Sequence, residues 1–298
     1  MVVANFIDAF QRAPRRYGFI DGVHALRAFA AISVVVYHAG GAVGADKYFA
    51  LAGIKQATSG LDCGVDIFFV ISGFVISLPL FLGKSQRIGR YVVNRLLRIY
   101  PISILTAVIF LGFGWLLYNR QPSLDQIASS ILLMPSETTA TPVVLWTLKQ
   151  ELLFYAVFSL TFIHSTLGLV VVFGWSIASL FVPDSSVFTH WFFNPHNVQF
   201  AFGILGAFLS TKFLVASKAA PWVAAISLTS VLGISEYSKL VEMNEALTAL
   251  MLGFFASGTV LGMASLRGRI PKPIIPHSPS KSLILLSGSQ YFRYKSWC

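Results

Sequence analysis

The sequence predicts an all-α membrane protein, a polytopic bundle of transmembrane helices in a single domain. Hydrophobic residues make up 55% of the 298 residues and charged residues only 11%, whereas ordinary soluble domains carry about 25% charged residues. The mean hydropathy is +0.71. Several apolar runs also approach the length of about 20 residues that an α-helix needs to cross a bilayer. These observations argue against a water-soluble globular enzyme.

Eight apolar runs, each bounded by charge, glycine or proline, are the expected spans. They cover residues 23–40, 64–83, 100–118, 145–163, 167–182, 198–211, 221–235 and 246–265. Several are short for a perpendicular crossing, so some ends extend into polar flanks or the count differs by one. Helix contacts in membranes favour small residues, and we expect Gly73, Gly203, Gly206 and Gly262 to serve this purpose.

The chain divides into three expected parts: an N-terminal arm (1–22), an integral membrane domain (23–266) and a proline-rich tail (267–298). No apolar run precedes the arginines of the arm, so we expect no removable signal peptide. The tail holds four prolines between positions 271 and 279, and its apolar run 283–286 is too short to span a membrane. We expect both the arm and the tail to be cytoplasmic.

Lysine and arginine distribution tests this topology, because short cytoplasmic loops carry the excess of positive charge. With a cytoplasmic N-terminus, sixteen of the 22 basic residues fall in inner segments and four in outer loops. The remaining two, Arg27 and Lys149, lie within spans. Orientation thus accounts for the formal charge of +10, and we expect membrane lipids, not nucleic acid, as the surroundings.

Metal and disulfide chemistry find little support in the sequence. The only cysteines are Cys63 and Cys298, which form neither a disulfide framework nor a zinc motif. We interpret four histidines as solvated residues of loops or tail and not as metal ligands. They are His164, His190, His196 and His277.

Arg27 and His38 are the first candidates for functional residues, because an ionisable side chain within a membrane span is energetically costly and is usually kept for a function. They lie eleven residues apart in LRAFAAISVVVYH. Eleven helical steps return to within about 20° of the start and rise about 16 Å, so the two residues share a helix face. The structural alternative is a snorkelling arginine and a histidine that is satisfied at its helix end.

Asp66 and Glu151 are expected at the same membrane depth as His38. A histidine with a nearby carboxylate is the minimum set for general base catalysis, since the carboxylate orients the ring and stabilises its charged form. Asp66 could instead oppose the dipole of the helix that it begins. Glu151 could instead pair with Lys149.

On the opposite side, Arg95 and Arg98 lie three residues apart in RLLRIYP and share a helical face. Positive-inside topology alone predicts basic residues there. Together with Arg27 they would form a pocket for a polyanion, since arginine makes bidentate contacts with phosphate. The predicted layout therefore has an anion site inside and a base outside.

These motifs resemble the membrane acyltransferase-3 family, whose members acylate exopolysaccharides, lipopolysaccharides and Nod factors. The resemblance rests on Arg27 with His38, GVDIFFVISGFVIS from Gly64, RLLRIYP, and LWTLKQELLFY from Leu145. The last motif is most similar to exopolysaccharide O-acetyltransferases. The resemblance implies a multi-pass enzyme of the bacterial inner membrane that moves an acyl group, usually acetyl from cytoplasmic acetyl-CoA, to a hydroxyl of a saccharide or lipid-linked saccharide.

The resemblance also implies roles for single residues. Arg27, Arg95 and Arg98 would bind the CoA phosphates, and His38 would act as base or transient acyl acceptor. Glu151 would orient or charge-balance His38, and Asp66 would have a catalytic or a structural part. No metal is implied.

The chain departs from the family at its end, where members usually have ten spans and this sequence offers eight followed by the proline-rich tail. An inactive, truncated homologue is therefore one alternative. The other is a proton-coupled transporter or flippase, because intramembrane His, Asp and Glu also form proton relays.

Overall fold

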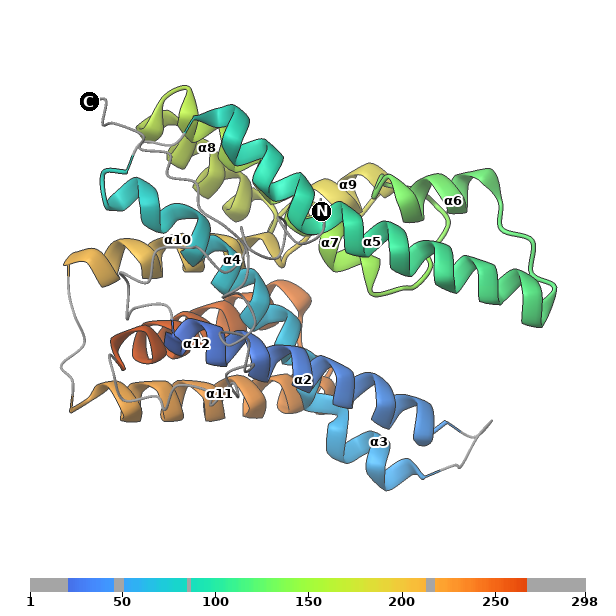
Figure 1. Cartoon of the computed structure of the whole chain (residues 1–298). Helices are drawn as coiled ribbons and strands as arrows, with labels where there is room; N and C mark the ends of the chain where they lie inside the picture. The colour runs from blue at the N-terminus through green and yellow to red at the C-terminus, as the bar shows by residue number, and fades with distance from the viewer. Residues whose placement is uncertain (1–20, 46–50, 85–86, 213–217, 267–298) are drawn as a thin grey trace, which may run out of the picture.

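The computed structural model describes residues 21–45, 51–84, 87–212 and 218–266, and within these ranges every regular element is a helix. This confirms the all-α fold class. The predicted arm lies outside the described residues except for its last two positions, and the predicted tail lies wholly outside them. Figure 1 shows the elements, which are α2 (Asp21–Val43), α3 (Ala52–Thr58), η1 (Ser59–Cys63), α4 (Gly64–Phe81), α5 (Ile88–Tyr118), α6 (Leu124–Ile131), α7 (Leu145–Phe158), η2 (Ser159–Phe162), α8 (Ser165–Ala178), α9 (Val187–Phe192), α10 (Asn197–Lys212), α11 (Ala220–Leu240) and α12 (Glu245–Ser265).

Four helices of the described ranges are long and apolar enough to cross a membrane. They are Asp21–Val43, the stretch Gly53–Phe81, Ile88–Tyr118 and Glu245–Ser265. The other four predicted spans also contain helices, but α7, α8 and α10 have only 14, 14 and 16 residues. Helix α11 has 21 residues and is long enough to cross a membrane, but its hydropathy is lower than that of the four helices above. Several long apolar helices in one chain are typical of a multi-pass membrane protein.

Helix α5 differs from its predicted span, because it begins at Ile88 instead of near residue 100 and continues through Pro101. Arg95 and Arg98, which precede the predicted span, therefore belong to the same helix as that span. Most apolar side chains of α5 are exposed. An exposed apolar face of this length suits a helix that faces lipid.

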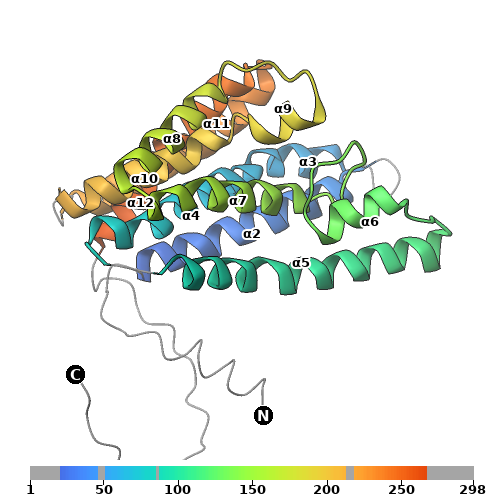
Figure 2. The same ribbon diagram turned by 90° about the horizontal axis from the view of Figure 1, so that it is seen from above.

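Helix α4 lies inside the bundle, packed against α2, α10 and α12 (Figures 1 and 2). Its closest neighbour is α10, where Gly73 and Gly203 let the two backbones meet. A Cβ atom on Gly73 would collide with the carbonyl oxygen of Phe200, and one on Gly203 with that of Val70. The structure thus confirms the predicted use of small residues at these two positions.

Side-chain caps fix where several helices begin. The Ser123 hydroxyl accepts the backbone N–H of Gln126 at the start of α6. The Asn244 carbonyl accepts the N–H groups of Ala246 and Leu247 at the start of α12. These side chains satisfy donors that a helix leaves without intrahelical partners.

The bundle has two distinct ends. In both views α3, α6 and α9 gather at one end, to which the last turns of α2 also point (Figures 1 and 2). Helices α2 and α5 begin toward the other end, where α4 finishes. We call the first of these the histidine end, because His38 lies near the end of α2. We call the second the arginine end, because Arg95 and Arg98 lie in the first half of α5.

Candidate functional site

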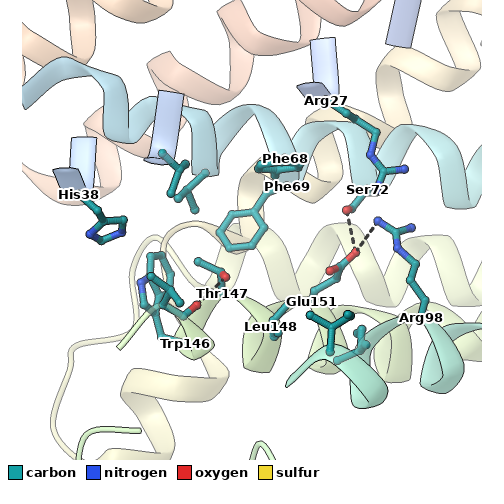
Figure 3. Close-up of a pocket in the computed structure, with 15 residues that line it drawn as sticks. Arg27, His38, Phe68, Phe69, Ser72, Arg98, Trp146, Thr147, Leu148 and Glu151 are labelled. Carbon is teal, nitrogen blue, oxygen red and sulfur yellow. Dashed lines mark hydrogen bonds and ion pairs between the residues drawn. The ribbon is translucent and has the colours of Figure 1, made fainter. Parts of the chain in front are cut away.

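A central cavity of about 330 Å³ lies between α2, α4, α5 and α7. Four of the six predicted site residues line it: Arg27, His38, Arg98 and Glu151 (Figure 3). Helix geometry explains part of this arrangement, since Arg27 and His38 share one face of α2. Both residues therefore line one cavity, whereas the sequence predicted only that they share a helix face.

Glu151 is the polar junction of three helices. One carboxylate oxygen accepts the Ser72 hydroxyl of α4 at 2.9 Å and the Tyr155 hydroxyl of α7, and it pairs with Arg98 Nη2 of α5 at 3.4 Å (Figure 3). The Glu151 side chain is only 12% exposed. Buried carboxylates need such partners, so this network fixes both Glu151 and Arg98.

The alternative pairing of Glu151 with Lys149 does not occur. Residues two apart on a helix point in different directions. The buried Lys149 ammonium instead donates to the Ser129 hydroxyl at 2.6 Å.

The contact between Arg98 and Glu151 corrects the predicted layout, which assigned the two residues to opposite sides of the membrane. Because α5 begins at Ile88, Arg98 lies about 15 Å into the helix. It thereby reaches Glu151 in the middle of α7.

Arginine side chains outnumber carboxylates at this end of the central cavity. Arg27 lies beside Arg98 in Figure 3, and within the described chain no hydrogen bond or ion pair engages its guanidinium. Arg95 lies over the rings of Tyr155 and Tyr91, at 5.2 and 5.7 Å from their centroids. Its buried Nε has no hydrogen-bond partner in the part of the chain that the structure describes. One carboxylate among three arginines leaves a net positive charge that suits an anion.

A basic cavity of about 320 Å³ adjoins this cluster. Arg95, His24 and Lys84 line it, and Arg27 lines both this cavity and the central one. Apolar side chains of α4, such as Phe74 and Leu78, form part of its wall. The basic cavity can therefore hold an anionic group beside Arg27, which also lines the central cavity.

His38 lies at the other end of the central cavity and is exposed. The ring of Tyr37 packs edge-on against it, with centroids 5.1 Å apart. Phe69 and Trp146 lie between His38 and Glu151 in Figure 3. Glu151 therefore does not touch His38, and the expected convergence of His38, Glu151 and Asp66 does not occur.

Asp66 lies outside the central cavity, in a pair that the sequence did not suggest. Its buried carboxylate accepts the Gln199 amide and lies 3.2 Å from Nδ1 of His196. Burial lowers the pKa of His196, but the hydrogen bond to Asp66 and the charge of this carboxylate, aided by Gln199 and Glu245, outweigh burial and raise it.

His196 therefore differs from the prediction of a freely solvated residue: its side chain is 34% exposed, and its ring pairs with Asp66. The segment before α10 folds back onto α4, and its contact with Asp66 joins residues too far apart in sequence for spacing to reveal it. The one available signal was the polar stretch Asn194–Asn197 between two apolar runs.

The remaining histidines are closer to expectation. His190 and Asp184 form a pair at 2.7 Å in which both side chains are exposed. His164 accepts the backbone N–H of Leu167 and caps α8. His277 lies outside the described residues. Among those residues, no group of three or more His, Cys, Asp or Glu is placed to hold a metal ion.

Fold and site together define a polytopic membrane protein whose interior joins an arginine cluster to an exposed histidine. The family profile described as an acyltransferase domain, that of the acyltransferase-3 family, matches residues 20–291, and the chain belongs to this family. Membership implies an acyltransferase. The match continues past residue 266, where the predicted membrane domain ends.

A curated relative adds a hint of the biological setting. The exopolysaccharide production protein ExoZ of Rhizobium meliloti (strain 1021) is 35% identical over 104 residues. This stretch covers 32% of the present chain and 32% of ExoZ. The match thus spans about a third of the relative's length. No solved structure matches the chain.

Proposed function

We propose that this protein is an integral membrane O-acyltransferase that moves an acyl group, in the simplest case acetyl, from acyl-CoA to a hydroxyl of an exported or lipid-linked saccharide. One observation carries the proposal: a single cavity has Arg27 and Arg98 at one end and His38 at the other. Family membership supports the acyl transfer, and the exopolysaccharide role in the name of ExoZ supports a saccharide acceptor.

The donor would bind at the arginine end. The phosphates of CoA would lie in the basic cavity, where Arg27 and Arg95 offer guanidinium donors. Arg98 is held by Glu151 and would present its remaining N–H groups to the same anion. In this proposal Glu151 is a positioning residue for Arg98.

The acyl group would be transferred at the histidine end. His38 would take the proton of the acceptor hydroxyl while the hydroxyl oxygen attacks the thioester carbonyl. The carbon–sulfur bond then breaks, and CoA leaves as a thiol after its sulfur takes that proton from His38. A route in which His38 carries the acyl group first fits the same cavity. Asp66 would act by orienting His196 and not by touching substrate.

The arginine end would face the cytoplasm of a bacterial inner membrane, with all eight predicted spans inserted. The excess of Lys and Arg in the inner segments supports this orientation. Acyl-CoA is a cytoplasmic metabolite, whereas an exported saccharide lies on the other side. A cavity between the two ends would let the acyl group pass while both substrates stay in their compartments.

The test measures O-acetylation of exopolysaccharide in cells that lack the endogenous activity and express either the wild type or His38→Ala. We expect His38→Ala to lower acetylation about 100-fold or more, because general base catalysis contributes that much. His164→Asn is the matched control, since asparagine keeps the cap of α8. Equal acetylation by wild type and His38→Ala, at equal membrane abundance, would contradict the proposal.

A proton-coupled transporter is the second candidate, and the pair formed by the buried Asp66 and the half-buried His196 favours it. Acidification-driven saccharide flux in vesicles distinguishes the two. Flux that depends on His196, without acyl transfer, would favour transport.

A further inference from the structure

A polar cavity of about 560 Å³ opens at the histidine end, between segment 135–143, α7 and α9. Its volume lies within the range of small-molecule sites. Ser136, Thr138, Gln150 and Trp191 present hydroxyl, amide and indole groups in its wall, beside a larger apolar area. Such a lining suits a ligand rich in hydrogen-bonding groups.

Two side chains of this polar cavity hold buried polar atoms that have no hydrogen-bond partner among the described residues: Oε1 of Gln150 and Nε1 of Trp191. Gln150 is only 3% exposed. Its amide nitrogen donates to the backbone oxygen of Trp191 at 3.0 Å, which fixes the side chain and leaves its oxygen free. Buried polar groups are rarely left unpaired in native proteins.

The two unpaired atoms are complementary to a hydroxyl. Gln150 Oε1 can only accept a hydrogen bond and Trp191 Nε1 can only donate one, whereas a hydroxyl does both. Both atoms are covered in the structure, so a ligand with several hydroxyl groups would satisfy them after these side chains turn toward the cavity, and it would also bond the hydroxyl side chains of the lining.

The charges of the polar cavity disfavour a polyanion. Lys149 lines it, but its ammonium already donates to Ser129. Two carboxylates, Glu137 and Asp184, line the same cavity, and Asp184 pairs with His190. This balance contrasts with the arginine cluster at the other end and points to an uncharged ligand.

Trp146 connects the polar cavity with the central cavity, since it lines both. Its flat ring offers the kind of aromatic surface on which the C–H face of a sugar packs. We propose that the polar cavity is the acceptor site, that it binds a neutral saccharide, and that Gln150 and Trp191 recognise one of its hydroxyl groups. This inference rests on the proposed function, because it assigns the acceptor to the end where His38 lies.

The test uses the purified full chain in detergent, with neutral oligosaccharides from deacetylated exopolysaccharide as the probe and calorimetry as the readout. We expect the wild type to bind the probe and Trp191→Phe to bind it roughly 3- to 10-fold more weakly, since only one hydrogen-bond donor is removed. Trp222→Phe is the matched control, because Trp222 is 70% exposed on α11. It should bind like the wild type.

Acyl-CoA binding, measured on the same samples, separates the two proposals. Unchanged acyl-CoA binding by Trp191→Phe shows that this variant is folded. If acyl-CoA binds but the oligosaccharides do not, or bind Trp191→Phe as well as wild type, the acceptor site is wrong and the donor site stands. If the oligosaccharides bind through Trp191 but acyl-CoA does not bind, the acyl-transfer proposal fails and the saccharide site stands.

Discussion

The two ends of the central cavity differ in how firmly their polar residues are held. At the arginine end, Arg98 and Glu151 belong to a network that joins α4, α5 and α7, with Ser72 and Tyr155 as further partners. At the histidine end, His38 is exposed, and the ring of Tyr37 packs edge-on against it. The difference suggests a division of labour: fixed charges suit the binding of an anion, whereas an accessible imidazole suits a reaction with an incoming hydroxyl.

The largest expected effect comes from removing Glu151, which holds the polar network at the arginine end together. Glu151→Ala leaves Arg98 without its ion pair and two hydroxyl groups without their acceptor. We expect the free energy of unfolding to fall by about 2–4 kcal/mol, because the loss of one partner strands a largely buried charge. Thermal unfolding in detergent measures this.

Two further variants isolate the role of the Glu151 charge. Glu151→Gln keeps a hydrogen-bond acceptor and should lose less stability than Glu151→Ala. Glu242→Gln changes an exposed carboxylate after α11 and should have almost no effect. Equal unfolding temperatures for Glu151→Ala and Glu242→Gln would show that the network contributes nothing.

Arg98→Lys tests whether the arginine end binds the donor, because it keeps the positive charge and removes the planar guanidinium group. We expect KM for acyl-CoA to rise about tenfold, since lysine cannot make bidentate contacts with phosphate. The value of kcat should change little if Arg98 only binds the donor. Steady-state kinetics with varied acyl-CoA measure both. Arg120→Lys, an exposed site just after α5, is the control; a fall in kcat at constant KM would place Arg98 in the chemical step instead.

The smallest expected effect concerns the Asp66–His196 pair, which lies outside the central cavity. The raised pKa of His196 means that the folded state binds its proton more tightly than the unfolded state. The resulting stability is fully present below the ordinary histidine pKa of about 6.5 and is lost as the pH rises through the raised value. Unfolding temperatures from about pH 6 to about pH 9 should thus fall more in the wild type than in His196→Gln. Parallel curves would contradict this.

Sequence patterns predicted the features that depend on one helix alone, such as which residues share a face and where the helices lie. The helical rise fixes Arg27 and His38 on one face of α2, and the apolar runs located the helices. Contacts between helices were less predictable. The Arg98–Glu151 pair depends on where α5 begins, and apolarity alone put that start at residue 100 although the basic residues before it also form helix. The Asp66–His196 contact depends on how a loop folds back, for which the sequence has no periodic signal.

The most direct test of the account compares acyl-CoA binding with acyl transfer in His38→Ala. If the central cavity separates donor binding from chemistry, the variant should bind acyl-CoA with the wild-type Kd and transfer about 100-fold less acyl group to the saccharide. Loss of both would contradict this division, as would transfer at the wild-type rate.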